Sequence, residues 1–252
     1  MDRAASRHRR EERWRLRAER ARDAFGLVLV LVLLNYVLTS LLDNRGWTAV
    51  LISLSVSATS IVALASSHSQ PQAVRAAIWV SALVTLFTVI AATTETHLWL
   101  NFASGIQIVL LAVAMAAVLR RVVTTAEVGS RTILGALSVY AVLGLIFTYL
   151  YGTIDRLQST PFFEGHQTPD GSDFIFFSYT TLTTTGYGNL VPDGQPGEMI
   201  SGLEMMIGQI FLVTLVAGLV SLWRPGEGLK RRLEKKRGGE IPGQPPASDS
   251  AS

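Results

Sequence analysis

The stretch TLTTTGYGNLVP, from Thr181 to Pro192, sets a run of hydroxyl residues before a tyrosine that lies between two glycines. Glycine tolerates positive φ, so Gly186 and Gly188 allow a backbone in which successive carbonyl groups turn to one side. Carbonyl oxygens in rings can replace the water shell of a cation. The predicted cation ligands are the carbonyls of Thr184, Thr185, Gly186 and Tyr187, together with the hydroxyl of Thr184.

The rest of the chain is unusually apolar. Of its 252 residues, 49% are hydrophobic and only 16% are charged, whereas about a quarter of the residues of a soluble domain are charged. The chain has no cysteine, which excludes disulfides, thiolate metal sites and a thiol nucleophile. The composition predicts a membrane protein.

Six apolar segments approach the length of about 20 helical residues that crosses a bilayer core. These segments lie near residues 24–42, 48–66, 75–93, 98–119, 132–152 and 199–223. A shorter apolar segment at 173–184 is better suited to a re-entrant helix, with Ser172 as its expected N-cap and Asp173 in its first turn. The expected fold class is an all-α integral membrane protein with six transmembrane helices and a re-entrant pore helix and loop between helices five and six.

Lysine and arginine are concentrated in the N-terminal arm, in the links between spans two and three and between spans four and five, and in the C-terminal tail. The positive-inside rule therefore predicts cytoplasmic termini, which an even number of spans satisfies. The expected domains are a basic arm (1–23), a four-helix domain (24–122), a linker (123–131), a pore domain (132–223) and a basic tail without structure (224–252). The arm and the tail could bind anionic lipid at the cytoplasmic surface.

The TTTGYGN motif resembles the selectivity-filter signature of the potassium channel family, whose Thr-Val-Gly-Tyr-Gly form is a general example of a K⁺ filter. The order of outer span, short re-entrant helix, motif and inner span is also similar to that family. The resemblance implies a passive, K⁺-selective channel without a bound cofactor, in a cell membrane. Because the chain holds one such motif and a closed ring needs four, it also implies a homotetramer.

The resemblance further implies roles for individual residues. The filter is Thr184 to Gly188, and Phe176, Phe177 and the Tyr187 ring brace it. Thr180 and Asn189 stand where many members place acids. Glu204, an intramembrane acid, is expected to bond the re-entrant helix or the filter backbone. The expected hinge and gate residues of the inner helix are Gly208, Leu212, Val216 and Val220.

Six spans also resemble the layout of voltage-gated channels, in which the fourth span carries repeated arginines. Here the fourth span has only the adjacent pair Arg120 and Arg121, at its cytoplasmic end, which predicts little intrinsic voltage dependence. Polar residues inside the early spans are expected to form interhelical hydrogen bonds. These residues are Asn35, Ser53, Ser55, Ser57, Thr59, Asn101 and Gln107.

Two alternatives to the K⁺ channel stay open. A non-selective cation channel is disfavoured by the intact Gly-Tyr-Gly motif. A non-conducting membrane subunit, whose pore module assembles only with other chains, differs from the channel by giving no flux on its own. An enzyme is not expected, since the sequence shows no motif of a catalytic nucleophile and no cluster of residues with the spacing of metal ligands. Nucleic-acid binding is not expected either.

Overall fold

The computed structural model describes residues 25–42, 46–67, 69–94, 97–124, 130–165 and 168–222. Regular structure in these residues is helical, apart from an isolated β-bridge between Phe163 and Pro192. The chain divides into two compact units between Val213 and Thr214. All contacts between residues that are described in the following paragraphs lie within the first unit. The helices are α2 (Phe25–Leu41), α3 (Trp47–Ser66), α4 (Pro71–Thr94), α5 (His97–Thr124), α6 (Ser130–Leu157), α7 (Gly171–Leu182) and α8 (Gly197–Leu222).

Five helical segments are long and apolar enough to cross a membrane. They are Trp47–Ser66, Pro71–Thr94, Leu98–Thr124, Thr132–Leu157 and Gly197–Gly218. The first of the six predicted spans corresponds to α2, an apolar helix of 17 residues, which is slightly short for a full crossing. The described residues therefore support a helical membrane protein with several spans. That α2 also crosses the membrane, which would make six spans in all, stays a prediction.

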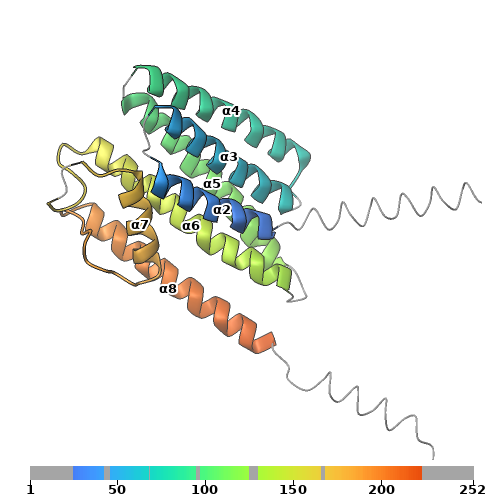
Figure 1. Cartoon of the computed structure of the whole chain (residues 1–252). Coiled ribbons are helices and arrows are strands. Elements are labelled where there is room, and N and C mark those ends of the chain that lie inside the picture. Colours follow the sequence, from blue (N-terminus) through green and yellow to red (C-terminus); the bar gives the residue numbers. More distant parts are fainter. Residues whose placement is uncertain are drawn as a thin grey trace, which may run out of the picture. The chain divides into compact units, whose positions relative to one another are not determined.

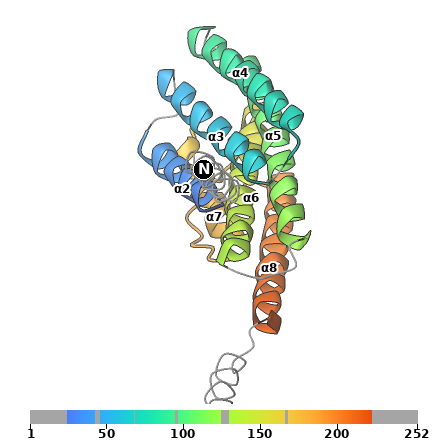
Figure 2. The same cartoon turned by 90° about the vertical axis from the view of Figure 1, so that its right-hand side faces the viewer.

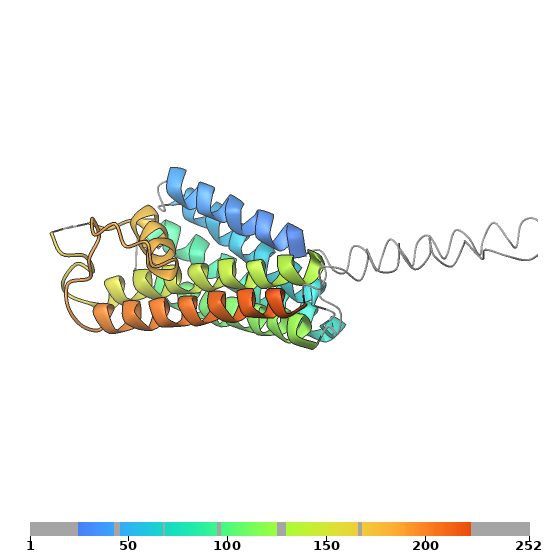
Figure 3. The same ribbon diagram turned by 90° about the horizontal axis from the view of Figure 1, so that it is seen from below.

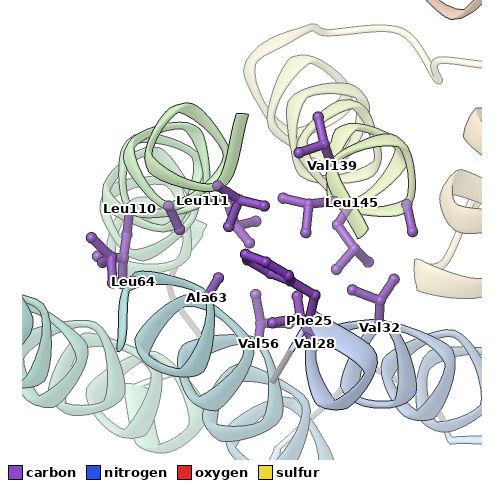
Figure 4. Packing of buried hydrophobic residues seen from close by; sticks show 14 of the residues in the cluster. Phe25, Val28, Val32, Val56, Ala63, Leu64, Leu110, Leu111, Val139 and Leu145 are labelled. Atoms are coloured by element: carbon purple, nitrogen blue, oxygen red, sulfur yellow. The ribbon is translucent and has the colours of Figure 1, made fainter. Parts of the chain in front are cut away.

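One core joins the early helices to α6. The ring of Phe25, from α2, lies between Val56 of α3 and Leu111 of α5, with Leu145 of α6 close by (Figure 4). Helix α6 itself lies between α2 and the first part of α8 (Figures 1 and 3). Helix α4 is at the edge of the bundle (Figures 1 and 2), and only 28% of its spanning window is buried. The outer helix of the predicted pore module thus packs directly against the four-helix domain of the same chain.

Hydroxyl groups on α3 connect it to three neighbouring helices. The amide of Asn35, from α2, donates to the Ser55 hydroxyl at 3.0 Å and to the Thr59 hydroxyl at 3.3 Å. Ser57 donates to Gln107 of α5, and Thr88 of α4 donates to Ser53. The predicted interhelical hydrogen bonds are therefore confirmed for these residues, and no charge is involved in them.

The start of α7 corrects one prediction. Asp170, rather than Ser172, is the N-cap, and its carboxylate accepts hydrogen bonds from the backbone N–H of Ser172 at 2.7 Å and of Asp173 at 3.3 Å. The Asp173 carboxylate in turn accepts from the backbone N–H of Asp170 at 3.0 Å. This reciprocal capping box satisfies amides that the first helical turn leaves open, and it sets two carboxylates at the positive end of the helix.

Several predictions fall on residues outside the described ranges. These include the N-terminal arm (1–23), the tail (224–252), most of the linker (123–131) and the side chain of Val220. Helix α5 ends at Thr124 and α6 begins at Ser130.

Candidate ion-conducting site

The backbone after α7 alternates in handedness. Thr184, Gly186 and Gly188 have φ values of 55°, 52° and 78°, while the residues between them are outside the left-handed region. Only glycine adopts positive φ without a steric cost, so Thr184 is held there by its surroundings. When left- and right-handed residues alternate, equivalent backbone groups of successive residues point to the same side of the chain. The loop therefore has the φ pattern that can direct a row of carbonyl oxygens to one side.

Backbone amides of this loop turn back towards α7. The N–H of Thr184 donates to the carbonyl of Thr181 at 2.9 Å. The N–H groups of Thr185 and Gly186 both donate to the carbonyl of Thr180, at 2.8 and 3.2 Å. Carbonyls at a helix C-terminus lack helical partners, and these bonds supply them. The amides of the first residues of the predicted filter are therefore used within the protein, while every residue from Thr183 to Asn189 is exposed.

The predicted aromatic brace is divided between two places. The ring of Tyr187 stacks on Phe176, with ring centroids 5.9 Å apart and an interplanar angle of 13°. Phe177 points elsewhere, into a buried aromatic cluster in which it contacts Tyr151 of α6 at a centroid distance of 5.1 Å. Phe176 is therefore the side chain that supports Tyr187, whereas Phe177 fixes α7 to α6.

The two positions that lack an acid are both neutral in the structure as well. Thr180 donates its hydroxyl hydrogen to the carbonyl of Phe177 at 3.0 Å, and Asn189 is exposed. A cavity of about 410 Å³ lies beside this part of the filter strand, lined among others by Tyr36, Thr180 and Tyr187. The residues that line this cavity are therefore aromatic, aliphatic or threonine, and none of them is charged.

Two tyrosines connect α7 to α6. Tyr140 donates its hydroxyl hydrogen to the carbonyl of Leu182 at 2.9 Å. Tyr179 donates to the carbonyl of Ala141 at 2.7 Å, and its ring meets Tyr36 of α2 edge-on at 5.4 Å. The last residue of α7 and the middle of that helix are thus both held in place by directional bonds to the outer helix.

Glu204 is buried at the meeting point of three helices. Its carboxyl oxygens lie 2.6 Å from the Tyr151 hydroxyl of α6 and 2.6 Å from the Ser178 hydroxyl of α7. The Ser178 hydroxyl also lies 2.8 Å from the carbonyl of Gly144. The predicted bond from Glu204 to the re-entrant helix is therefore present, and it goes to a side chain rather than to the filter backbone.

Gly208 is placed where α8 passes closest to the end of α7. A Cβ atom at this position would overlap the carbonyl oxygen of Leu182 and would lie 2.9 Å from its Cδ1 atom. Further along α8, Leu212 is half-buried and Val216, which belongs to the second unit, is exposed. The structure thus gives Gly208 a packing role, while the predicted hinge and gate roles stay predictions.

The end of the predicted filter loop is bonded to the loop that follows α6. The N–H of Glu164 donates to the carbonyl of Val191 at 2.9 Å, and the N–H of Asp193 donates to the carbonyl of Phe162 at 2.8 Å. These bonds flank the β-bridge between Phe163 and Pro192. Both ends of the filter loop are therefore anchored to the α6–α7 module.

Sequence reasoning missed the role of Arg156. This residue lies beyond the end of the predicted fifth span (132–152), but the structure includes it in α6, and its guanidinium reaches Asn101 and Ser104 of α5, each at 2.8 Å. Tyr151 and Ser178 were missed as well. Their sole sequence signal is that each is a polar residue within an apolar segment, a signal that many early-span residues share.

Comparison with known proteins finds a family match in the second half of the chain. Residues 135–224 match the family model described as "Ion channel", and this match runs from α6 through α7 and the filter loop to the end of α8. No curated protein and no solved structure matches the chain. The family match and the apolar helices together support an ion channel of the K⁺-channel type.

Proposed function

We propose that this chain is one of four identical subunits of a K⁺-selective channel. In this proposal the carbonyls of Thr184, Thr185, Gly186 and Tyr187 bind dehydrated K⁺ ions in passive flow, with the Thr184 hydroxyl at the inner end and Gly188 closing the loop. The channel lies in the cell membrane with both termini in the cytoplasm.

The observation that carries the proposal is the alternation of positive φ at Thr184, Gly186 and Gly188. Together with amides that donate to the end of α7, this alternation favours carbonyl oxygens on the opposite, accessible side of the strand. Such oxygens can replace the hydration shell of a cation. The end of α7, where the helix dipole leaves partial negative charge, lies directly before the strand and favours a cation there.

One strand supplies one wall of such a site, so four copies are required. Helix α8 provides apolar surface for this assembly, because large side chains along it are exposed in the single chain. Among these are Leu203, Met206, Ile207, Ile210 and Val213. An exposed apolar face on a membrane helix can contact either lipid or another copy, and the proposal assigns part of it to the neighbouring subunits.

Flux from purified protein in liposomes tests the proposal. The chain alone should pass K⁺ and should pass Na⁺ far more slowly. Equal permeability would refute K⁺ selectivity and favour a non-selective cation channel. Failure to conduct at all in assembled protein would favour a non-conducting subunit.

A pair of glycine substitutions tests the site. Gly186→Ala and Gly194→Ala both put a methyl group on a residue with positive φ, 52° and 78°, where nothing lies within 4 Å of the new atom. Both substitutions therefore place a side chain on a left-handed residue without a clash within the chain, and only Gly186 lies in the proposed filter. We expect Gly186→Ala to lower the K⁺/Na⁺ flux ratio and Gly194→Ala to keep it, whereas equal effects would contradict the site assignment.

A further inference from the structure

Glu204, Tyr151 and Ser178 form a polar cluster in an otherwise apolar region between α6, α7 and α8. Each of the three residues is 0% exposed. Three short contacts connect the cluster: Tyr151 hydroxyl to Glu204 Oε2, Ser178 hydroxyl to Glu204 Oε1, and Ser178 hydroxyl to the carbonyl of Gly144. Each contact joins two oxygen atoms at 2.8 Å or less, so each needs a hydrogen atom between them.

Counting the available hydrogens determines the state of Glu204. A serine or tyrosine hydroxyl supplies one hydrogen each, a backbone carbonyl only accepts, and an ionised carboxylate only accepts. Tyr151 uses its hydrogen on Glu204 Oε2. Ser178 then has one hydrogen for two neighbouring oxygens, the carbonyl of Gly144 and Glu204 Oε1. With an ionised carboxylate, one of these contacts would bring two oxygens together without a hydrogen.

A proton on Glu204 satisfies all three contacts. In that state Glu204 Oε1 donates to the Ser178 hydroxyl, which donates to the carbonyl of Gly144, while Tyr151 donates to Oε2. The titratable groups that face Glu204 are tyrosines: Tyr140 and Tyr151 of α6 and Tyr179 of α7.

The surroundings also lack a cation in the part of the chain that the structure describes. Arg156, which follows Tyr151 by five residues on α6, donates instead to Asn101 and Ser104 on α5. A buried carboxylate without a paired cation is costly, whereas a neutral carboxylic acid with both oxygens in hydrogen bonds is tolerated.

We propose that Glu204 is protonated in the folded protein and is a positioning residue that acts as a hydrogen-bond donor, joining the inner helix to the pore helix. Ser178, which receives this bond, lies on α7, and α7 ends at Leu182 immediately before the filter strand. Loss of the proton at alkaline pH breaks the chain of bonds to Gly144 and loosens α7. K⁺ flux should then fall reversibly as pH is raised; this functional part rests on the proposed K⁺ conduction, whereas the protonation itself does not.

Infrared spectroscopy of the tetramer in lipid at neutral pH tests the proton directly. A protonated carboxyl group has a carbonyl stretching band that is separate from the carboxylate bands and shifts on exchange into D₂O. We expect this band in the wild-type protein and its loss in Glu204→Gln. In Ser178→Ala the band should remain at a shifted frequency, because the acceptor of the proton is gone. A wild-type spectrum without a band that depends on Glu204 overturns the proposal.

The matched variants Glu204→Gln and Glu204→Leu test the role of the hydrogen bonds. A glutamine amide N–H can donate to Ser178 and its carbonyl can accept from Tyr151, so Glu204→Gln should assemble, conduct K⁺ at neutral pH and lose the alkaline fall in flux. Glu204→Leu has neither group and should lose tetramer stability. Failure of Glu204→Gln to assemble, or an unchanged alkaline fall in it, contradicts the proposal. If the wild-type protein conducts no K⁺, the proposed function fails while the infrared result still decides the protonation.

Discussion

Replacing Gly208 by alanine should damage the filter by pushing two helices apart. The added methyl group would overlap the Leu182 carbonyl oxygen and approach Leu182 Cδ1 to 2.9 Å and the Leu182 carbonyl carbon to 3.3 Å. Most of these atoms belong to the backbone of α7, so no side-chain rotation relieves the overlap. The same carbonyl accepts the hydrogen bond from Tyr140 at 2.9 Å, and the residues that follow it lead into the filter.

The size of the effect follows from two opposing terms. Forcing an extra methyl group into a packed site costs about 1–3 kcal/mol. Replacing glycine by alanine within a helix contributes about 1 kcal/mol in the other direction. Gly202→Ala on the same helix carries only the second term, because its new Cβ atom would have nothing within 4 Å. The difference between the two variants therefore isolates the first term. We therefore expect the two variants to differ in free energy of unfolding by about 1–3 kcal/mol for each subunit, with Gly208→Ala the less stable.

Thermal unfolding of the purified protein and the K⁺/Na⁺ flux ratio measure this prediction. Gly208→Ala should unfold at a lower temperature and should be less selective, whereas Gly202→Ala should match or exceed the wild type in stability and keep its selectivity. Equal stability of the two variants would refute the packing argument. A hinge role alone would lower the open fraction of the channel without changing either measurement.

Further predictions concern the cap of α7, the bond between α5 and α6, and the response to voltage. Asp170→Ala should lower stability by about 0.5–2 kcal/mol, as measured by denaturant unfolding, while Asp170→Asn, which keeps a capping oxygen, should lose less. A double-mutant cycle of Arg156→Gln and Asn101→Ala should give a coupling energy of about 1.5–3 kcal/mol, the range for hydrogen bonds to a charged group; additive effects would contradict the bond. The conductance–voltage curve should be shallow, because each charge moved through 100 mV contributes about 2.3 kcal/mol and Arg120 and Arg121 both lie near the C-terminal end of α5; a steep curve would refute this.

The sequence predicted those features that depend on local pattern. The short length of the segment at 173–184 predicted a helix too short to span, and α7 occupies Gly171–Leu182. Hydroxyl and amide groups in the early spans predicted interhelical bonds, since such groups have few other partners in lipid. The first predicted span, 24–42, corresponds to α2, which has 17 residues and is slightly short for a full crossing.

Features that depend on distant contacts were not predictable. Tyr151 and Glu204 are 53 residues apart in the chain, and Arg156 is 55 residues from Asn101. The pattern of apolar and polar residues within one helix carries no information about which residue of another helix its side chains will contact. The N-cap of α7 was misplaced for a different reason, because Asp170 and Ser172 are both good capping residues and only the geometry of the preceding loop selects between them.

The buried face of α8 explains why hydropathy alone gives little information about this helix. Its buried positions are Gly197, Ser201, Glu204 and Gly208, spaced by three or four residues along one side. A helix of a soluble protein buries its apolar side, but here the small and polar side is buried and large apolar side chains are exposed. Small residues let α8 approach the backbone of α7 at Leu182, and Glu204, the one long polar side chain among these buried positions, reaches the Ser178 hydroxyl. The contacts that fix α7 to α8 therefore come from the least hydrophobic residues of an apolar segment, and substitutions that raise its hydrophobicity at Glu204 or Gly208 should weaken the protein rather than strengthen it.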